Sequence, residues 1–149
     1  MIFRPAVRAD LPAIVALLAD DVLGRDRDRA VVDDAYERAF AAIDADPRNE
    51  EIVAEDGGEI VACLQVTYIP GLGRHGMQRA LVESVRVRPD LRGRGVGAAL
   101  MTWVVDRARA RGCGLVQLTT DKARADAHRF YERLGFVASH EGMKLHLTS

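Results

Sequence analysis

Hydrophobic residues in the first half of the chain follow two periods, and the change between them predicts the order of its elements. Leu11, Ile14 and Leu17 are spaced by three residues and are joined by Leu18, which places them on one face of a helix. Two mainly apolar runs flank Gly57-Gly58, a dipeptide typical of a β-hairpin turn. The elements expected here are a strand at Ile2–Pro5, a helix capped by Asp10, a polar break at Arg25–Arg29, a helix at Asp33–Asp44, a turn at Asp46–Asn49, and strands at Glu51–Asp56 and Glu59–Ile69.

The second half predicts a buried strand followed by a long helix. The strand Ala80–Val87 is apolar at both parities except at Glu83, Ser84 and Arg86, as in an inner strand that is covered on both faces. A helix at Gly95–Arg111 follows, with a buried stripe of Val96, Ala99, Leu100, Trp103 and Val104. The other elements expected are a glycine-rich loop at Pro70–Gly76, a short inner strand at Leu115–Thr119, a helix at Arg124–Leu134, and a final hairpin of Phe136–Ala138 with Met143–Leu147. Together these elements predict an α/β fold with a mixed sheet.

The length of the chain, its two cysteines and the lack of a long apolar run limit the classes of protein to which it can belong. With 149 residues the chain has the size of one domain, so we expect a single domain over residues 1–149. Cys63 and Cys113 are too few and too far apart for a disulfide framework or a zinc site, which favours a reducing compartment and no metal. The first 20 residues show no leader pattern, and no apolar run approaches about 18 residues. We therefore expect a cytoplasmic protein with no membrane partner.

The charges are distributed unevenly along the chain. The net charge of −1 argues against a nucleic-acid partner. Residues 10–60 nevertheless hold fifteen acidic residues against five arginines, and residues 86–111 hold seven arginines against two aspartates. The basic segment predicts an anionic ligand, and the acidic segment suits either a cationic acceptor or a solvated helix face.

The segment between the inner strand and the long helix predicts where that anion binds. Its sequence is Arg92-Gly-Arg-Gly-Val-Gly-Ala98. The first N–H groups of a helix lack intrahelical partners and the helix dipole adds positive charge, so phosphate oxygens bind well there. Glycine permits the tight turn, and Arg92 and Arg94 add permanently charged donors. We therefore expect a phosphorylated ligand.

This loop matches one nucleotide-binding motif and lacks the residues of another. Gly93, Gly95 and Ala98 satisfy the dinucleotide fingerprint G-x-G-x-x-G/A, with Asp121 as a ribose partner, so a nucleotide-binding α/β protein stays an alternative. The chain beyond this loop is short for the βα units of a doubly wound sheet. A P-loop fits the segment less well, because no Gly-Lys-Ser/Thr follows.

The spacing Arg92-x-x-Gly95-x-Gly97 is followed thirty residues later by Ala127-His-Arg-Phe-Tyr-Glu-Arg-Leu-Gly-Phe136. With these two motifs, residues 78–147 resemble the GCN5-related N-acetyltransferases. In that family the first motif binds the pyrophosphate of acetyl-CoA, and the second lies on the next helix and strand. The resemblance implies a mixed, mostly antiparallel central sheet flanked by helices on both faces. One position differs from the second family motif: the motif begins with asparagine, and this chain has Arg124 there.

The resemblance also implies which residues bind acetyl-CoA. Backbone of the inner strand would pair with the pantetheine amides as an added strand, and its N–H groups would polarise the thioester carbonyl. The binding residues implied are Val85, Arg86, Val87, Arg92, Gly93, Arg94, Gly95, Val96, Gly97, Ala98 and, at the asparagine position, Arg124.

Two side chains are the candidate catalytic residues. By resemblance Tyr131 lies near the sulfur of CoA, where its phenol can protonate the departing thiolate. Glu83 has the parity of Val85 and Val87 and is the candidate base for the acceptor ammonium, with a salt bridge or a direct ammonium contact as alternatives. His128 precedes Tyr131 by about one helical turn and would relay protons unless it faces solvent.

The implied reaction transfers acetyl to a primary amine of a small molecule by direct attack in a ternary complex. Cys63 and Cys113 have no adjacent base in the sequence that would support an acyl-enzyme. Acceptor contacts are expected from Arg25–Arg29, Pro70–Gly76 and the final hairpin. A protein N-terminus as acceptor, a homodimer, and a catalytically silent acyl-CoA-binding module in place of an enzyme stay open.

Overall fold

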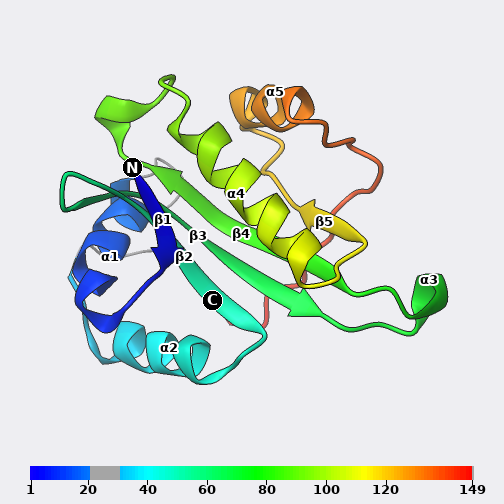
Figure 1. Cartoon of the computed structure of the whole chain (residues 1–149), viewed down its shortest axis with the longest axis horizontal. Coiled ribbons are helices and arrows are strands. Elements are labelled where there is room, and N and C mark those ends of the chain that lie inside the picture. Colours follow the sequence, from blue (N-terminus) through cyan, green and yellow to red (C-terminus); the bar gives the residue numbers. More distant parts are fainter. Residues whose placement is uncertain (21–30, 149) are drawn as a thin grey trace. The chain divides into compact units, whose positions relative to one another are not determined.

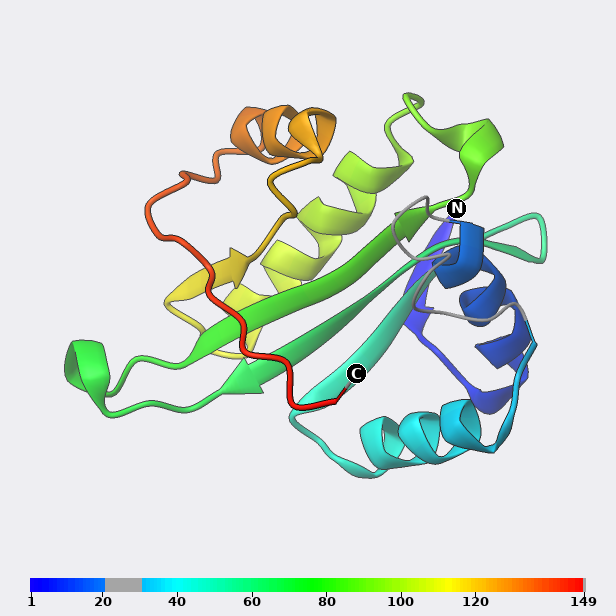
Figure 2. The same cartoon turned by 180° about the vertical axis from the view of Figure 1, so that it is seen from behind.

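The computed structural model describes residues 1–20 and 31–148 (Figures 1 and 2). The expected break at Arg25–Arg29 lies outside the described residues. The chain divides into two compact units, residues 1–117 and residues 118–149. Within the described part of the chain, no helix is long and apolar enough to cross a membrane.

A five-stranded sheet forms the centre of the first unit, whose boundary falls within the last strand. In spatial order the strands are β1 (Ile2–Pro5), β2 (Asn49–Asp56), β3 (Glu59–Ile69), β4 (Arg79–Val87) and β5 (Leu115–Leu118). β1 to β4 pair antiparallel, whereas the arrows of β4 and β5 point the same way in Figures 1 and 2. The mixed, mostly antiparallel sheet is confirmed. β4 is an inner strand as predicted, but β5 is an edge strand, so the prediction of an inner strand there is wrong.

Left-handed backbone conformations mark two of the turns. Gly57 and Gly58, with φ of +59° and +83°, form the predicted hairpin turn between β2 and β3, where glycine takes these angles without steric cost. The expected loop at Pro70–Gly76 contains α3 (Gly73–Gly76), a single turn in which Arg74 and His75 also have positive φ, +54° and +61°. Those two residues are exposed.

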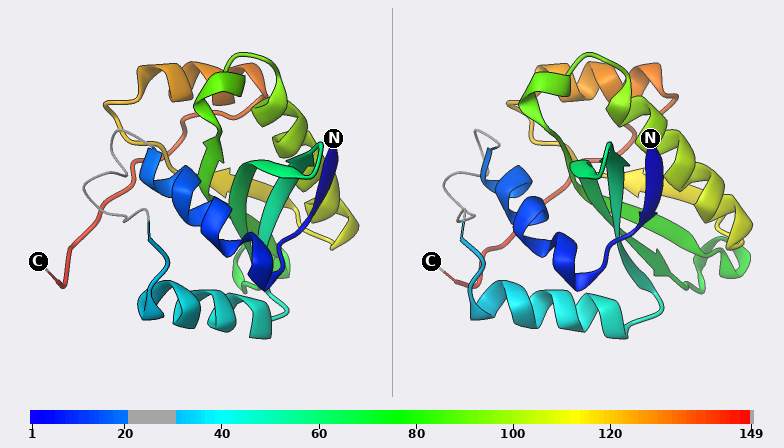
Figure 3. Two further views of the ribbon diagram at one scale, coloured as in Figure 1. Left: turned by 90° about the vertical axis from the view of Figure 1, so that its left-hand side faces the viewer. Right: turned by 60° about the vertical axis from the view of Figure 1, so that its left-hand side comes forward.

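Two helices, α1 (Leu11–Asp20) and α2 (Asp34–Ala45), cover one face of the sheet (Figure 3). Their side chains pack against Val53 and Cys63, which are fully buried. The carboxylate of Asp33 caps α2 by accepting from the N–H groups of Ala35 and Tyr36, at 3.0 and 3.3 Å. The other members of this core are Ala6, Leu11, Ile14, Val15, Leu17 and Phe40.

Asp10 does not cap α1 as predicted. It ends a short 3-10 turn, η1 (Arg8–Asp10), and its carboxylate accepts from the N–H of Val7 at 2.8 Å. Arg4 donates two further hydrogen bonds to it, at 2.7 and 3.1 Å. The hydrogen bonds from Arg4 lower the pKa of Asp10, although burial opposes them. Its oxygens are therefore occupied by the strand and turn that precede α1.

The helix α4 (Val96–Ala110) covers the opposite face (Figure 3). Its predicted buried stripe is partly wrong, because Met101 and Ala108 are buried in place of Ala99 and Trp103. Trp103 is partly buried, and its ring lies 6.2 Å from the ring of Phe3 on β1. The helix is thus rotated slightly from the expected orientation, with its tryptophan near the edge of the core.

An ion cluster holds the C-terminal turns of α4 against β2. Glu50 accepts from Arg107 at 2.8 and 2.6 Å and from the phenol of Tyr68 at 2.7 Å. Arg111 lies 3.5 Å from Glu50 and its guanidinium stacks 3.9 Å from the centre of the Tyr68 ring. Burial opposes ionisation of Glu50, but these partners outweigh it and lower its pKa. Arg107 and Arg111, at the C-terminal end of the helix, therefore anchor it to the sheet.

The second unit contains α5 (Ala125–Arg133) and an aromatic cluster. The ring of Tyr131 packs edge-to-face with Phe130 and Phe136, at centroid distances of 5.0 and 5.8 Å. Gly135, with φ of +98°, lies just after the helix. The predicted final hairpin is wrong, since no strand forms among the described residues from 134 to 148.

Candidate functional site

The second half of β4 contains a β-bulge inside the segment expected to meet the cofactor. Glu83 and Arg86 each pair with β3, but Ser84 and Val85 between them stand opposite a single residue. Ser84 has φ of +54°, a left-handed conformation that residues other than glycine rarely adopt. A bulge bends the strand and changes the direction of its side chains.

This bulge makes the parity prediction for Glu83 wrong. Glu83 and Arg86 pair with Gln65 and Cys63, which are two residues apart on β3, so their side chains share a face. Because Cys63 belongs to the core under α1 and α2, Glu83 lies on the face that those helices cover. Val87 lies on the other face. Glu83 is exposed there and does not share the side of Val87.

The backbone of Val87 points toward the β5 side of β4. The N–H of Arg88 donates to the carbonyl of Val61 at 2.8 Å, and the alternation of an antiparallel ladder then turns the N–H and C=O of Val87 away from β3. β5 has four residues against nine in β4, and it begins beside the start of β4, where Gly114 N–H donates to Gln78 C=O at 2.8 Å. The last residues of β4 thus extend beyond β5, which leaves the N–H of Val87 for a ligand, whereas the carbonyls of Val85 and Val87 accept from the side chains of Arg86 and Arg92.

The loop after β4 contains two glycines in left-handed conformations. Gly93 and Gly95 have φ of +77° and +83°. A Cβ atom at either position would meet nothing within 4 Å, so the backbone conformation rather than crowding calls for glycine here. The Nε of Arg92 donates to the carbonyl of Val87 at 3.2 Å and ties the loop to the end of β4.

The start of α4 fits a pyrophosphate. Its first intrahelical hydrogen bond runs from Ala99 N–H to Gly95 C=O at 3.0 Å, so the N–H groups of residues 96–98 precede it and have no helical partner. The backbone N–H of Arg94 donates to the carbonyl of Leu91 at 3.3 Å, and its exposed guanidinium, whose charge helps to lower the pKa of Asp90, makes no hydrogen bond or ion pair with another described residue. Free N–H donors beside an uncommitted guanidinium form a site for an anion. The structure therefore brings together the residues predicted from Val85 to Ala98.

Arg124 and Tyr131 belong to the second unit. Arg124 is the N-cap of α5 and provides no side-chain cap. Asparagine, which the family motif has here, is among the best N-cap residues because its side chain accepts from helix N–H groups, and arginine has no acceptor. His128 is partly buried, and its Nε2 finds no hydrogen-bond partner among the described residues.

A polar row crosses the face under α1 and α2, and sequence reasoning missed one of its members. The strand register aligns Glu51 of β2, Gln65 of β3 and Glu83 of β4. Glu51 is partly buried, and desolvation of its carboxyl raises its pKa to about 8. No hydrogen bond or ion pair reaches its carboxyl from another described residue. The available signal was strand parity, since Glu51 precedes the core residue Val53 by two.

The cysteines do not form a nucleophilic site. Cys63 is fully buried, and burial followed by the nearby Glu51 raises the pKa of its thiol well above the usual range. Cys113 is partly buried, and its sulfur accepts from Nε2 of Gln78 at 3.4 Å. Neither thiol has the surroundings of an activated nucleophile.

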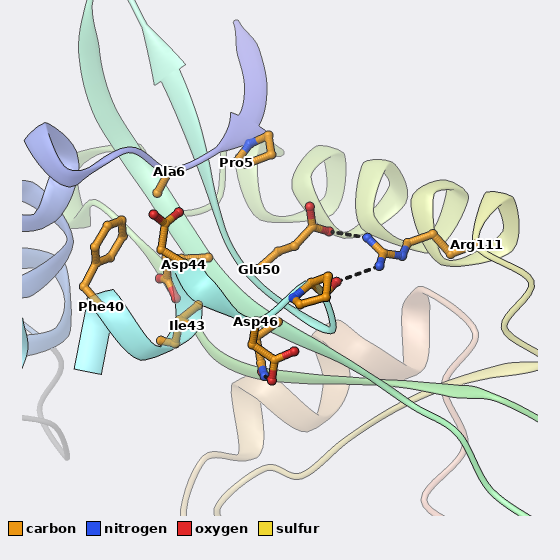
Figure 4. A pocket seen from close by; sticks show the side chains of 11 residues that line it. Pro5, Ala6, Phe40, Ile43, Asp44, Asp46, Glu50 and Arg111 are labelled. Atoms are coloured by element: carbon orange, nitrogen blue, oxygen red, sulfur yellow. Dashed lines mark hydrogen bonds and ion pairs between the residues drawn. The ribbon is translucent and has the colours of Figure 1, made fainter. Parts of the chain in front are cut away.

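A pocket of about 350 Å³ opens in the first unit at the start of β2 (Figure 4). Arg111 spans its rim and contacts Glu50 at 3.5 Å and the carbonyl of Pro47 at 2.8 Å. The start of β2 pairs with the end of β3, so the pocket lies at the opposite end of the strands from the Arg92 loop. No group of three or more potential metal ligands occurs among the residues described. The remaining lining residues are Pro5, Ala6, Phe40, Ile43, Asp44, Asp46, Asn49 and Glu51.

The model of the acetyltransferase (GNAT) family matches residues 15–136. The aminoalkylphosphonate N-acetyltransferase of Salmonella typhimurium is 31% identical over 137 residues, which are 92% of this chain and 85% of that protein. The L-methionine sulfoximine/L-methionine sulfone acetyltransferase of Pseudomonas aeruginosa is 31% identical over 139 residues, with 91% and 80% covered.

One solved structure is similar over almost the whole chain. The crystal structure of a transcriptional regulator from Bacillus halodurans C-125 has a TM-score of 0.96 and 52% identity, and the match covers 98% of this chain and 99% of that one. The likeness therefore includes the sheet, its helices and the loop that precedes α4.

Proposed function

This chain belongs to the acetyltransferase (GNAT) family and is an N-acetyltransferase, and on that premise we propose its substrates and mechanism. Enzymes of this family use acetyl-CoA as the acetyl donor. We infer that this one passes the acetyl group to a primary amine of a small molecule, by direct attack of the amine in a ternary complex.

The observation that carries this proposal is the junction between β4 and α4. The N–H groups of residues 96–98 and the guanidinium of Arg94 are unpaired in the described chain and suit the pyrophosphate of CoA. The backbone of Val85–Val87 leads up to that junction, and its N–H groups are the donors for the pantetheine amides, since the carbonyls of Val85 and Val87 already accept from Arg86 and Arg92. Arg86 completes this segment, and Arg124 of the second unit is a further candidate for a phosphate group.

The acceptor must first become neutral, since an alkylammonium of pKa about 10.4 cannot attack while protonated. Glu83 accepts this proton, directly or through a water molecule. Its position on the face under α1 and α2 sets the side from which the acceptor approaches. Gln65 and Glu51 continue the same polar row and provide hydrogen-bonding groups for the rest of the acceptor.

The transfer itself exchanges one bond for another. The amine nitrogen attacks the thioester carbon, whose oxygen is polarised by N–H groups of the β4 bulge region, and a C–N bond forms. The C–S bond then breaks and its electron pair leaves with sulfur. Tyr131 donates its phenolic proton to this thiolate and regains one from solvent, while the nitrogen releases its second proton as the amide forms.

The class of acceptor is supported by the names of two relatives. One is named for aminoalkylphosphonates and the other for methionine sulfoximine and methionine sulfone, all of which are small molecules with an amine. Each relative shares more than nine-tenths of this chain's length. A small primary amine is therefore the acceptor class to test first.

The test is release of free thiol from acetyl-CoA over a panel of amines. The panel contains aminoalkylphosphonates, methionine sulfoximine, simple diamines and a peptide with a free N-terminus. We expect at least one small amine to accelerate thiol release above the rate of acetyl-CoA hydrolysis. Release with the peptide alone would contradict the acceptor class, and binding of acetyl-CoA without release by any member would contradict the proposed activity.

Cofactor placement is tested by Arg94→Ala against Arg109→Ala. Each change removes one positive charge. Arg94 lies just before the first residue of α4, whereas Arg109 lies in its last turn and pairs with Asp106 at 2.9 Å. Loss of a charge-assisted phosphate contact should weaken acetyl-CoA binding by about 1–3 kcal/mol for Arg94→Ala. The control should bind like the parent in calorimetry. Equal affinity of both variants would contradict the pyrophosphate assignment.

A further inference from the structure

The pocket at the start of β2 has negative charge that the arginine at its rim does not balance. Arg111 is already committed to Glu50 and to the carbonyl of Pro47. Asp44 and Glu51 also line the pocket, and no hydrogen bond or ion pair reaches either carboxyl from another described residue. The pocket lies at the C-terminal end of α2, which is the negative end of that helix dipole. These groups together favour a cation.

The surroundings of Glu51 show that its carboxyl lies in a recess. Solvent reaches the side chain, which is only partly buried, yet the surrounding protein desolvates the carboxyl enough to raise its pKa. The wall beside it is apolar, with Phe40 and Ile43 from α2 and Pro5 from β1. A ligand that carries a positive group on an apolar chain matches both parts of this pocket.

The same carboxyl stands at the end of the polar row that begins at the proposed base. Glu83, Gln65 and Glu51 are in register on three adjacent strands, and solvent reaches all three side chains. The next pair on this face, Val53 and Cys63, is fully buried. Neighbouring strands lie about 4.8 Å apart, so the row spans about 10 Å from β4 to β2. An open polar strip therefore connects the base with the pocket.

We propose that this pocket binds a second, non-reacting ammonium group of the acceptor, so that the preferred acceptors are linear diamines long enough to reach from Glu83 to Glu51. The inference rests on the proposed function, which places the reacting amine at Glu83. That amine loses its proton and attacks the thioester, while the other end stays charged beside Glu51 and Asp44. The methylene chain lies along the strip, over Gln65.

The length and the charge of the acceptor both follow from this arrangement. Extended hexanediamine nearly spans the row, whereas ethylenediamine is too short to reach both carboxyl groups. A carboxylate or phosphonate at the far end would meet Glu51 and Asp44 as a like charge and would be rejected. The preferred acceptor thus differs from the aminoalkylphosphonates for which one relative is named.

The test compares thiol release with hexanediamine, hexylamine and aminohexanoate, which differ at the end far from the reacting amine. At about pH 9 Glu51 is mostly ionised and an alkylammonium group is still charged. After allowance for the two reactive ends of the diamine, its kcat/KM should exceed that of hexylamine at least about tenfold, chiefly through a lower KM. Aminohexanoate should be the poorest of the three.

Variants at the two carboxyl groups should reduce this preference. Glu51→Gln should lower the ratio of hexanediamine to hexylamine at least about fivefold, and Asp44→Asn should lower it about twofold or more, since Asp44 is exposed. Asp34→Asn is the matched control, because it removes one aspartate from the first turn of the same helix. This control should keep the ratio of the parent.

Binding without acetyl-CoA locates the second ammonium. In amide NMR spectra, hexanediamine should shift residues 43–51 more than hexylamine does. Shifts confined to residues 83–98 would overturn the pocket assignment, and equal losses in Asp34→Asn and Glu51→Gln would reduce the preference to bulk charge. Equal kcat/KM for diamine and monoamine would contradict this inference alone, whereas failure of every amine to accelerate thiol release would contradict the proposed function. The amine series and Asp44→Asn decide the matter even if Glu51→Gln does not fold.

Discussion

At the scale of single residues, two carboxyl groups of one polar row differ sharply in their surroundings. Glu83 is exposed on β4, whereas Glu51 is partly buried on β2 and its carboxyl has no hydrogen-bond or ion-pair partner among the described residues. Burial disfavours the charged form, so the pKa of Glu51 rises to about 8 from its usual 4.5. A buried acid of this kind contributes to stability in a pH-dependent way.

Glu51→Gln should therefore change the pH dependence of stability. With the folded-state pKa raised, the contribution of this carboxyl is fully present below pH 4.5 and is lost as the pH rises through about 8. The parent should lose up to about 1.4 kcal/mol per pH unit over this window, and the variant should not. Urea unfolding at several values between pH 5 and 9 measures the difference. An exposed control, Glu132→Gln, should follow the parent, and a Glu51→Gln curve parallel to the parent would contradict the prediction.

Glu83→Gln tests the proposed base. The variant should lose most activity below the pKa of the acceptor amine and recover partly at high pH, where the acceptor arrives already neutral. The profile of kcat/KM against pH is the measurement, with Glu51→Gln as a control from the same row. An unchanged profile for Glu83→Gln would leave that residue with a structural role, and the same change in Glu51→Gln alone would move the base to Glu51.

Tyr131→Phe tests the proposed acid by removing one oxygen. The ring contacts with Phe130 and Phe136 should survive, so folding and acetyl-CoA affinity should change little. The departing thiolate loses its proton donor, and kcat should fall by about 10² to 10⁴. Tyr68→Phe removes a phenol that bonds only within the Glu50 cluster, and it should lower stability rather than kcat. A Tyr131→Phe variant with an undiminished acetyl-transfer step in pre-steady-state kinetics would exclude the role.

At the scale of elements, α5 begins without the side-chain cap that its position calls for. Arg124→Asn introduces an acceptor for the first N–H groups of the helix and should stabilise the protein by about 0.5–1 kcal/mol. If Arg124 also binds a phosphate of CoA, the same variant should bind acetyl-CoA less tightly. Thermal unfolding and calorimetry separate the two effects. Arg124→Ala adds no cap, so a variant pair with equal stability would contradict the capping argument.

Elements with a long, regular pattern could be predicted from the sequence. The ranges of β3 and α4 follow the apolar periodicity to within about a residue, and the helix predicted from Asp33 begins at Asp34 with Asp33 as its cap. The β4 bulge could not be predicted, because Ser84 is not a glycine and nothing local marks its positive φ. That one inserted residue reverses the face of Glu83. The edge position of β5 could not be predicted either, since strand order depends on segments far apart in the chain.

In the candidate site too, features that depend on neighbouring residues were predicted, and features that depend on strand pairing were missed. The loop from Arg92 to the start of α4 was predicted because glycine conformation and helix termini are local properties. Glu51 was missed because its relation to Glu83 passes through β3 and needs the strand register. Motifs thus predict the loop proposed for the cofactor, and strand register shows which polar side chains share a face of the sheet.

At the scale of the whole molecule, the size of the chain predicts one domain over residues 1–149, although its contacts cluster into two units. A unit of about thirty residues is too small to bury a sufficient core alone. We therefore expect it to fold only together with the first unit. The sequence agrees with this expectation, because no low-complexity linker separates the two units.

Unfolding of the full chain should accordingly be a single cooperative transition. Trp103 is the only tryptophan in the sequence and reports on the first unit, while amide exchange of residues 125–133 reports on α5. In guanidinium the tryptophan signal and the loss of protection in α5 should share one midpoint. Acetyl-CoA at about 100 times its dissociation constant should shift both by the same free energy, about 2.7 kcal/mol. Exchange of α5 at denaturant concentrations where Trp103 keeps its native emission would show two domains, and a shift confined to the tryptophan signal would assign the cofactor to the first unit alone.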